Sequence, residues 1–145
     1  MTDSKLELDK QICHSLYSAS NALVRAYRPL LQPLDLTYPQ YLVMMSLWQY
    51  NDVSIRQLSE HCLLDSGTLT PLLKRLEGKG LLHRMHSKSD ERQKVISLSE
   101  RGHQLKAQAE TVPEQMACNI KQGRERALEL KALCESLLLD LSKQQ

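Results

Sequence analysis

The chain has 145 residues, 41% of them hydrophobic, and a formal net charge of +2, which is typical of one globular domain. Asp3, Glu7 and Asp9 interrupt the N-terminal stretch, so we expect no secretory signal, and no apolar run is long enough to cross a membrane. We therefore expect a cytoplasmic protein without a membrane partner. Its four cysteines would be reduced at rest, and any disulfide would be a redox event.

Positive charge concentrates in residues 61–109, which hold nine Lys and Arg against five Asp and Glu, a net charge of +4. Residues 1–60 and residues 110–145 each hold five basic against six acidic residues. A solvated charged surface would also give such an excess. The motifs of the basic segment favour a surface that attracts nucleic acid.

The first helix is predicted over residues 9–31, with its opening aspartate as the cap, because apolar side chains recur at helical spacing. Pro29 is expected to bend or end this helix, and Pro33 supports the break. A capping box at residues 37–40 then predicts a second helix over residues 38–50. Its inward-facing residues are expected to be Leu42, Met45 and Trp48.

Two further helices follow, separated by a short turn, which is helix-turn-helix spacing. A capping box at residues 54–57 opens the first of them, and the second begins with Asp65 or Ser66 as its cap and stops at Gly80. The second helix has one narrow apolar stripe, and its other face offers small, hydroxyl and basic residues that suit a DNA groove. An ordinary amphipathic surface helix remains the alternative for this pattern. The stripe consists of Leu69, Leu72, Leu73 and Leu76.

Two strands are predicted next, over residues 81–87 and 93–99, because apolar, basic and β-branched residues dominate both. A charged tip, residues 88–92, joins them. A helix-turn-helix followed by a basic hairpin is the order of elements in a winged helix, in which the hairpin tip reaches a second groove of the DNA.

More helices are predicted after the hairpin. Ser99 opens a helix toward Glu110, and residues 111–114 repeat the capping-box spacing around a proline, which predicts a sharp kink or a helix restart. A last helix, residues 124–141, has a wide apolar face. Terminal helices this hydrophobic favour packing against a second copy of the chain. A symmetric dimer would place two DNA-reading helices about one DNA turn apart on a palindrome.

These elements predict one domain, residues 1–145, that is mainly α with a small β-hairpin. We expect a winged helix-turn-helix lobe at about residues 38–98 and a dimerisation lobe formed by the terminal helices, about residues 9–31 and 99–143. The chain resembles the MarR family of dimeric winged-helix regulators. The residues that carry this resemblance are Asp65–Pro71, Lys74–Glu77, Gly80–Leu81, Asp90–Arg92 and Leu98–Gly102.

A second set of residues resembles the organic hydroperoxide resistance regulators within that family. This set is Leu8–Cys13, Ala26–Pro29 and Leu36–Tyr41. The resemblance implies a homodimeric repressor that releases its operator when an organic hydroperoxide oxidises Cys13, and it implies that Tyr27 and Tyr38 are hydrogen-bonded to that cysteine. Some members carry a second cysteine that forms a disulfide with the oxidised sensor of the partner subunit. Cys118 matches the position of that second cysteine.

The residues themselves favour the same chemistry. Cys13 falls near the start of the first helix, where the helix dipole favours the thiolate that attacks a peroxide oxygen. Tyr27 lies fourteen residues further along, which is about 21 Å at 1.5 Å per residue, so a contact with Cys13 must cross to an antiparallel partner helix. Tyr17 lies one turn after Cys13 and can line the same pocket. An inert buried cysteine, with the tyrosines packed in the core, is the alternative.

The same resemblance, together with the charge pattern, assigns a set of residues to DNA contact. Lys74 and Arg75 are expected to contact phosphates and bases, and the hydroxyl side chains are expected to lie nearer the bases. Arg92 at the hairpin tip is expected to enter the minor groove, with Asp90 steadying it. The full set is Asp65, Ser66, Gly67, Thr68, Thr70, Lys74, Arg75, Lys88, Asp90 and Arg92.

Other chemistry has weak support. His83 and His86 make a poor metal pair, because residues three apart on a strand face opposite ways. The chain also lacks a CxxC motif, a glycine-rich phosphate loop and paired carboxylates, so we predict no enzyme activity, metal or cofactor. Cys62 and Cys134 are expected to be structural. Two alternatives remain open: a MarR-type regulator of small aromatic ligands with Cys13 incidental, and a thiol peroxidase, which would leave the hairpin unexplained.

Overall fold

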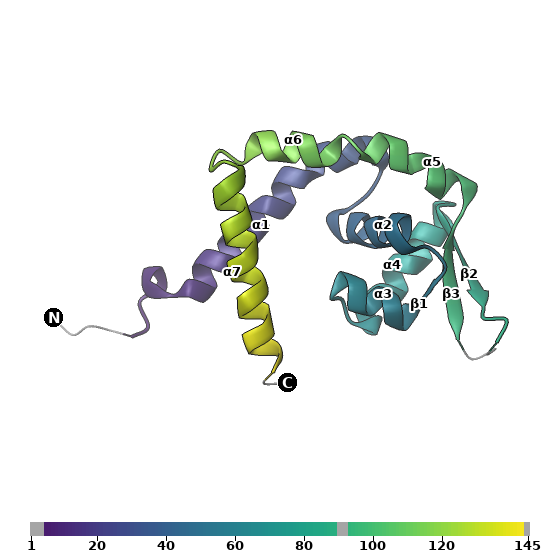
Figure 1. Cartoon of the computed structure of the whole chain (residues 1–145), viewed down its shortest axis with the longest axis horizontal. Helices are drawn as coiled ribbons and strands as arrows, with labels where there is room; N and C mark the ends of the chain where they lie inside the picture. The colour runs from purple at the N-terminus through teal and green to yellow at the C-terminus, as the bar shows by residue number, and fades with distance from the viewer. Residues whose placement is uncertain (1–4, 90–92, 144–145) are drawn as a thin grey trace. The chain divides into compact units, whose positions relative to one another are not determined.

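The computed structural model describes residues 5–89 and 93–143, and the chain forms two compact units, Met1–Glu110 and Thr111–Gln145. Helices predominate, and the strands form one small sheet, so the predicted fold class is confirmed (Figure 1). That residues 1–145 make one domain stays a prediction. Over the described ranges, no helix is both long and apolar enough to cross a membrane.

The first helix begins later than predicted. Asp9 lies inside a short 3-10 helix, η1 (Leu8–Lys10), and therefore cannot cap α1 (Ile12–Leu31). Gln11 precedes α1 without a side-chain cap hydrogen bond, and donates its amide instead to the carbonyl oxygen of Lys5 at 2.8 Å. Pro29 does not end the helix, because α1 continues past it to Leu31. Pro33 lies in a second 3-10 helix, η2 (Gln32–Leu34).

The second helix, α2 (Tyr38–Tyr50), has the predicted bounds and the predicted capping box. The backbone N–H of Thr37 donates to Gln40 Oε1 at 3.1 Å, and the N–H of Gln40 donates to Thr37 Oγ1 at 3.4 Å. The predicted inward face is wrong: Val43, Met44 and Leu47 are fully buried. The helix is apolar on nearly every side, so spacing did not single out one face. The residues predicted to face inward, which are only half-buried, are Leu42, Met45 and Trp48.

The helix-turn-helix is confirmed as α3 (Ile55–Cys62), a three-residue turn and α4 (Ser66–Gly78). Asp65 caps α4 by accepting a hydrogen bond from the backbone N–H of Thr68 at 2.6 Å. Gly80 follows the end of α4 with φ +76°, the left-handed conformation that glycine adopts without strain. The leucine stripe of α4 is buried. The exposed fractions of Leu69, Leu72, Leu73 and Leu76 are 0%, 8%, 0% and 0%.

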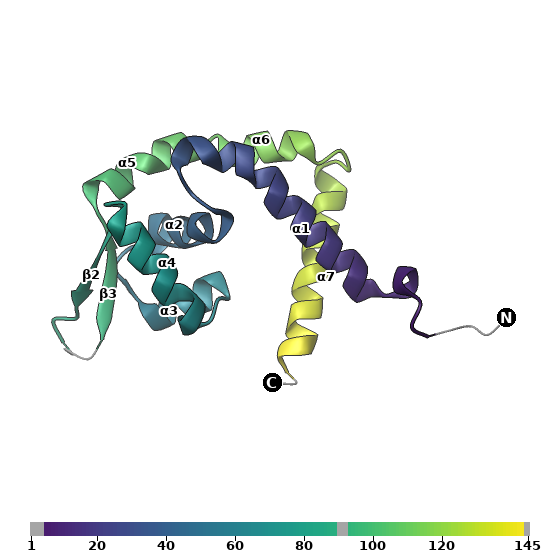
Figure 2. The same ribbon diagram turned by 180° about the vertical axis from the view of Figure 1, so that it is seen from behind.

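The hairpin is confirmed as β2 (Leu82–His86) and β3 (Lys94–Leu98), which pair antiparallel with Leu82 opposite Leu98. A third strand, β1 (Val53–Ser54), was not predicted, and it pairs with β3 to give the order β1-β3-β2. Figures 1 and 2 both show α2, α3 and α4 gathered beside this sheet, whereas the N-terminal half of α1 extends away from them.

Three helices complete the chain. Ser99 caps α5 (Glu100–Ala109) by accepting from the backbone N–H of Gly102 at 3.0 Å, as predicted. In the second unit a helix restarts as α6 (Val112–Asn119), but Thr111 makes no side-chain cap hydrogen bond because its backbone is already helical, so the predicted capping box does not form. The last helix, α7 (Arg124–Ser142), has no buried residue among those described.

Candidate functional site

The exposed face of α4 carries the residues predicted to contact DNA. Ser66, Gly67, Thr68, Thr70, Lys74 and Arg75 are all exposed, as is the capping Asp65. The hydroxyl of Thr70 donates to the carbonyl oxygen of Ser66 at 2.8 Å, which orients it along the helix. Hydrogen bonds from the backbone and side chain of Thr68 lower the pKa of Asp65, so that cap stays ionised and fixes the first turn.

An ion pair fastens α4 to the hairpin. Glu77 Oε1 accepts from Arg84 Nε at 3.2 Å and Nη2 at 3.0 Å, and Glu77 Oε2 accepts from the backbone N–H of Arg84 at 3.0 Å. These hydrogen bonds lower the pKa of Glu77. A carboxylate that holds both the side chain and the main chain of β2 fixes the angle between the two elements. Sequence reasoning missed this pair, because nothing in the spacing distinguishes it from solvated surface charges.

The hairpin tip is described only in part. Lys88 is exposed, and the backbone N–H of Ser87 donates to the carbonyl oxygen of Gln93 at 2.7 Å across the base of the tip. Asp90 and Arg92, which were predicted to steady and enter the minor groove, lie outside the described residues. Their roles stay predictions.

Three tyrosines meet where α1 ends and α2 begins. The ring centroids of Tyr27 and Tyr38 are 4.8 Å apart, and Tyr41 lies 5.9 Å from Tyr27 and 6.4 Å from Tyr38. Burial raises the pKa of all three hydroxyls, so they are protonated hydrogen-bond donors at neutral pH. The structure therefore brings the two predicted sensor tyrosines together. Tyr41, only 3% exposed, was missed as a member of the group because an aromatic side chain at helical spacing is usually core.

Cys13 lies apart from this tyrosine cluster within one chain. It is the second residue of α1 and is exposed, whereas Tyr27 lies fourteen residues later in the same unbroken helix. At 1.5 Å per residue the two are about 21 Å apart along the helix axis. The surroundings of Cys13 are apolar but uncovered: Ile12 is 74% exposed and Tyr17 70%. A single chain therefore holds the two halves of the predicted sensor at opposite ends of α1.

The other cysteines differ in exposure. Cys118 is exposed near the end of α6, and its carbonyl oxygen accepts from Lys121 Nζ at 3.0 Å. Cys62 is half-buried, and burial raises the pKa of its thiol, which fits the predicted structural role. Cys134 is exposed on α7, a helix with no buried residue among those described, so its structural role stays a prediction.

A pocket of about 600 Å³ lies between the last turn of α1 and the start of α2. Tyr38 lines it together with Arg28, Leu31 and Lys79. Its walls are mainly apolar, and they include two cationic side chains and one acidic side chain, Asp35. No cluster of three or more possible metal ligands occurs within residues 5–89 and 93–143. His83 and His86 lie three apart in β2, the arrangement expected to point them to opposite faces.

Known proteins share this architecture. A model of the MarR family matches residues 36–94. The organic hydroperoxide resistance transcriptional regulator of Bacillus subtilis (strain 168) is 41% identical over 133 residues, which cover 92% of this chain and 90% of that protein. The structure of reduced AbfR bound to DNA is 35% identical with a TM-score of 0.81, and the match covers 99% of this chain and 98% of that one. The structure of disulfide-formed AbfR is 35% identical with a TM-score of 0.62, over 94% and 90% of the two chains.

Proposed function

Because this chain belongs to the MarR family and is a transcriptional regulator, we propose that it is a homodimeric repressor that senses organic hydroperoxides through Cys13. In the reduced state the dimer binds a pseudo-palindromic operator in double-stranded DNA, and oxidation releases it. The observation that supports this proposal is the separation, along one helix, of an exposed cysteine from a cluster of tyrosines that are half-buried or buried.

The DNA-binding part rests on α4 and the hairpin. The leucine stripe anchors α4 in the core, so its opposite face presents small, hydroxyl and basic side chains to solvent. The hydrogen bonds that Glu77 accepts from Arg84 hold the hairpin against α4, which a protein needs in order to enter two DNA grooves at once. Reduced AbfR, 35% identical to this chain, has been solved bound to DNA.

The dimer part rests on uncovered apolar surface. In α1, Ile12 and Leu16 are 74% and 42% exposed, and in α7, Leu128 and Leu133 are 54% and 69% exposed. Large apolar side chains left exposed on each of these helices are costly in water and favour an interface. If α1 packs antiparallel against α1 of a second copy, the Cys13 end of each helix lies beside the tyrosine end of the other. The sensor then forms only between subunits, and the tyrosine hydroxyls can donate to the Cys13 sulfur.

The chemistry has two steps. The thiolate of Cys13 attacks the terminal oxygen of the hydroperoxide, the O–O bond breaks, and the products are a sulfenic acid and an alkoxide that takes up a proton to become the alcohol. The thiol of Cys118 in the partner subunit then attacks the sulfenic sulfur, which forms a disulfide and expels water. AbfR, 35% identical to this chain, has been solved in a disulfide-formed state.

Operator binding measured with and without one equivalent of an organic hydroperoxide tests the proposal. The wild type should bind when reduced and release when oxidised, whereas Cys13→Ser should bind in both conditions, since a serine hydroxyl does not form a sulfenic acid. Release by Cys13→Ser would place the sensor elsewhere.

The disulfide step has its own test, in which Cys134→Ser is the matched control because Cys134 is also exposed. Non-reducing electrophoresis of oxidised protein should show a linked dimer for the wild type and for Cys134→Ser, and a monomer for Cys118→Ser. A linked dimer that survives Cys118→Ser would eliminate the two-cysteine mechanism and leave an external thiol as the partner of Cys13.

The pocket beside Tyr38 favours one second candidate, a regulator of small aromatic acids, because its walls are mainly apolar and Arg28 offers a cation for a carboxylate, whereas the ammonium of Lys79 is paired with Asp35. Operator release by an aromatic acid under reducing conditions, with no release by hydroperoxide, would support that candidate. A thiol peroxidase would instead consume many equivalents of hydroperoxide when a thiol reductant is supplied.

A further inference from the structure

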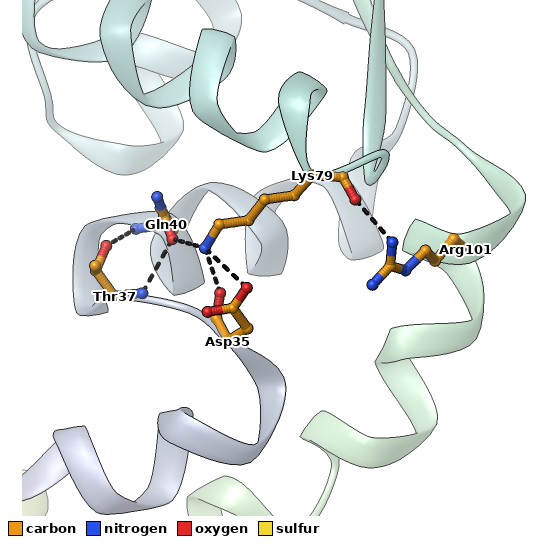
Figure 3. Close-up of polar contacts among 5 residues, drawn as sticks. All are labelled: Asp35, Thr37, Gln40, Lys79 and Arg101. Carbon is orange, nitrogen blue, oxygen red and sulfur yellow. Dashed lines mark hydrogen bonds and ion pairs between the residues drawn. The ribbon is translucent and has the colours of Figure 1, made fainter.

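Lys79 sits where three parts of the first unit meet. It is the residue that follows α4, and its side chain, 29% exposed, crosses to the linker between α1 and α2. Figure 3 shows the ammonium group lying between Asp35 and Gln40. Lys79 Nζ donates to the carbonyl oxygen of Asp35 and to Gln40 Oε1 at 3.1 Å, and it lies 3.6 Å from Asp35 Oδ2.

Gln40 ties this contact to the start of α2. Its side chain is 3% exposed, and the same Oε1 atom that accepts from Lys79 also accepts from the backbone N–H of Thr37 at 3.1 Å. One buried oxygen therefore serves both the cap of α2 and the end of α4. Tyr38, a member of the tyrosine cluster, is the first residue of α2 and lies inside this capping box.

The main chain around Lys79 is held from the opposite side. Arg101 Nη1 of α5 donates to the carbonyl oxygen of Lys79 at 3.0 Å (Figure 3), and the hydroxyl of Ser99 donates to the carbonyl oxygen of Gly80 at 2.6 Å. The end of α4 is thus fixed by α5 through its backbone and by the α1–α2 linker through its side chain. The linker and the end of α4 are therefore in direct contact.

We propose that Lys79 is a positioning residue that couples the tyrosine cluster to α4, and this inference rests on the proposed function. When oxidation of Cys13 withdraws the sulfur from the tyrosine hydroxyls, Tyr38 shifts and carries the start of α2 with it. A half-buried ammonium does not give up its acceptors without a large desolvation cost, so the end of α4 follows. The helix that reads DNA then turns relative to the operator.

The test compares the ratio of operator Kd between oxidised and reduced protein in three proteins. These are the wild type, Lys79→Met and the control Lys106→Met, which removes the same charge from an exposed position on α5. We expect the ratio of oxidised to reduced Kd to be at least threefold lower in Lys79→Met than in the wild type. The ratio in Lys106→Met should equal that of the wild type. The rate of Cys13 oxidation, followed by thiol titration, should be the same in all three, because Lys79 acts after the chemistry.

A phosphate contact by Lys79 is the simplest competing role, and salt dependence separates it. Loss of a phosphate contact reduces the slope of log Kd against log salt by about 1, whereas loss of a positioning residue leaves the slope unchanged. An unchanged Kd ratio in Lys79→Met, a reduced slope, or slower Cys13 oxidation would each overturn the coupling. If oxidised and reduced wild-type protein had the same operator Kd, the proposed function itself would be overturned.

Asp35→Asn keeps the test decisive if Lys79→Met does not fold. Asp35 has φ +54°, a conformation that asparagine adopts readily, so the substitution removes the charge without straining the linker. We expect Asp35→Asn to lower the Kd ratio as Lys79→Met does, but by less. Lys79 can still donate to the carbonyl oxygen of residue 35 and to Gln40 Oε1. A ratio equal to that of the wild type would contradict the inference.

Discussion

Gly102 is the position where one added methyl group should do most damage to the fold. It lies in the first turn of α5, and an added Cβ would come within 2.1 Å of the carbonyl oxygen of Leu81 and 3.1 Å of a methyl group of Leu98. Ordinary contact begins at 3.4 Å, so α5 and the backbone of Leu81, just before β2, must separate by about 1.3 Å. The oxygen of Leu81 cannot turn aside, because it accepts from the backbone N–H of Ser99 at 3.0 Å.

The magnitude follows from what that movement breaks. The carbonyl oxygen of Gly102 accepts from Trp48 Nε1 at 2.9 Å, and its N–H donates to Ser99 Oγ at 3.0 Å. Overpacking costs about 1–3 kcal/mol and each strained hydrogen bond about 1 kcal/mol, whereas alanine gains about 1 kcal/mol in helix propensity. Gly102→Ala should therefore destabilise the protein by about 2–4 kcal/mol, which lowers Tm by about 5–15 °C in a chain of this size.

Thermal unfolding, monitored by circular dichroism, measures this change in Tm. All proteins are compared at one concentration, because the stability of a dimer depends on protein concentration. Gly78→Ala is the matched control: a Cβ at that position in α4 meets nothing within 4 Å, so the same substitution should raise stability by about 0.5–1 kcal/mol. A Tm for Gly102→Ala within a degree of the wild type would refute the reasoning, since it would mean that α5 does not press on Leu81.

Two further predictions concern α4 and the hairpin. Because Arg84 lowers the pKa of Glu77 below its unfolded value of 4.5, the stabilisation is present above pH 4.5 and lost as pH falls through the folded pKa. The Tm difference between the wild type and Glu77→Gln should therefore be largest near pH 6 and shrink by pH 3, and a difference that stays constant in calorimetry would contradict the pair. Lys74→Ala should weaken operator binding and reduce the slope of log Kd against log salt by about 1, without changing the dimer mass in ultracentrifugation. Thr68→Ala should weaken binding and leave that slope unchanged. Unchanged operator affinity in both variants would reject α4 as the DNA-reading helix.

Features set by neighbouring residues could be predicted from the sequence. The capping boxes at residues 37–40 and 54–57 and the left-handed Gly80 each depend on a few adjacent residues, and all three formed as predicted. Of the two caps predicted for α4, Asp65 and Ser66, the structure uses Asp65. The leucine stripe of α4 was equally clear, because small, hydroxyl and charged residues and one proline occupy the rest of that helix.

Features that depend on residues far apart in the chain could not be predicted from the sequence. Strand β1 has two residues and no pattern of its own, and exists because β3 offers it an edge. The buried face of α2 was ambiguous because nearly every side of that helix is apolar. Asp9 was a plausible cap by type, but the chain makes a 3-10 turn there first.

The candidate site also has features that the sequence could predict and features that it could not. Cys13, Tyr27 and Tyr38 came from motif resemblance, and helix length alone showed that Cys13 and Tyr27 cannot meet within one chain. The contacts that would transmit a signal, from Lys79 to Asp35 and Gln40, join residues about forty positions apart. No local pattern predicts which lysine of a basic segment turns inward.

The central claim is that one hydroperoxide per Cys13 switches the dimer off its operator. Fluorescence anisotropy of a labelled operator, titrated with an organic hydroperoxide at fixed protein concentration, tests it most directly. Our account predicts that release is complete near one equivalent per chain, that excess thiol reductant restores binding, and that Cys13→Ser stays bound throughout. Release that requires many equivalents, or that proceeds equally in Cys13→Ser, would contradict it.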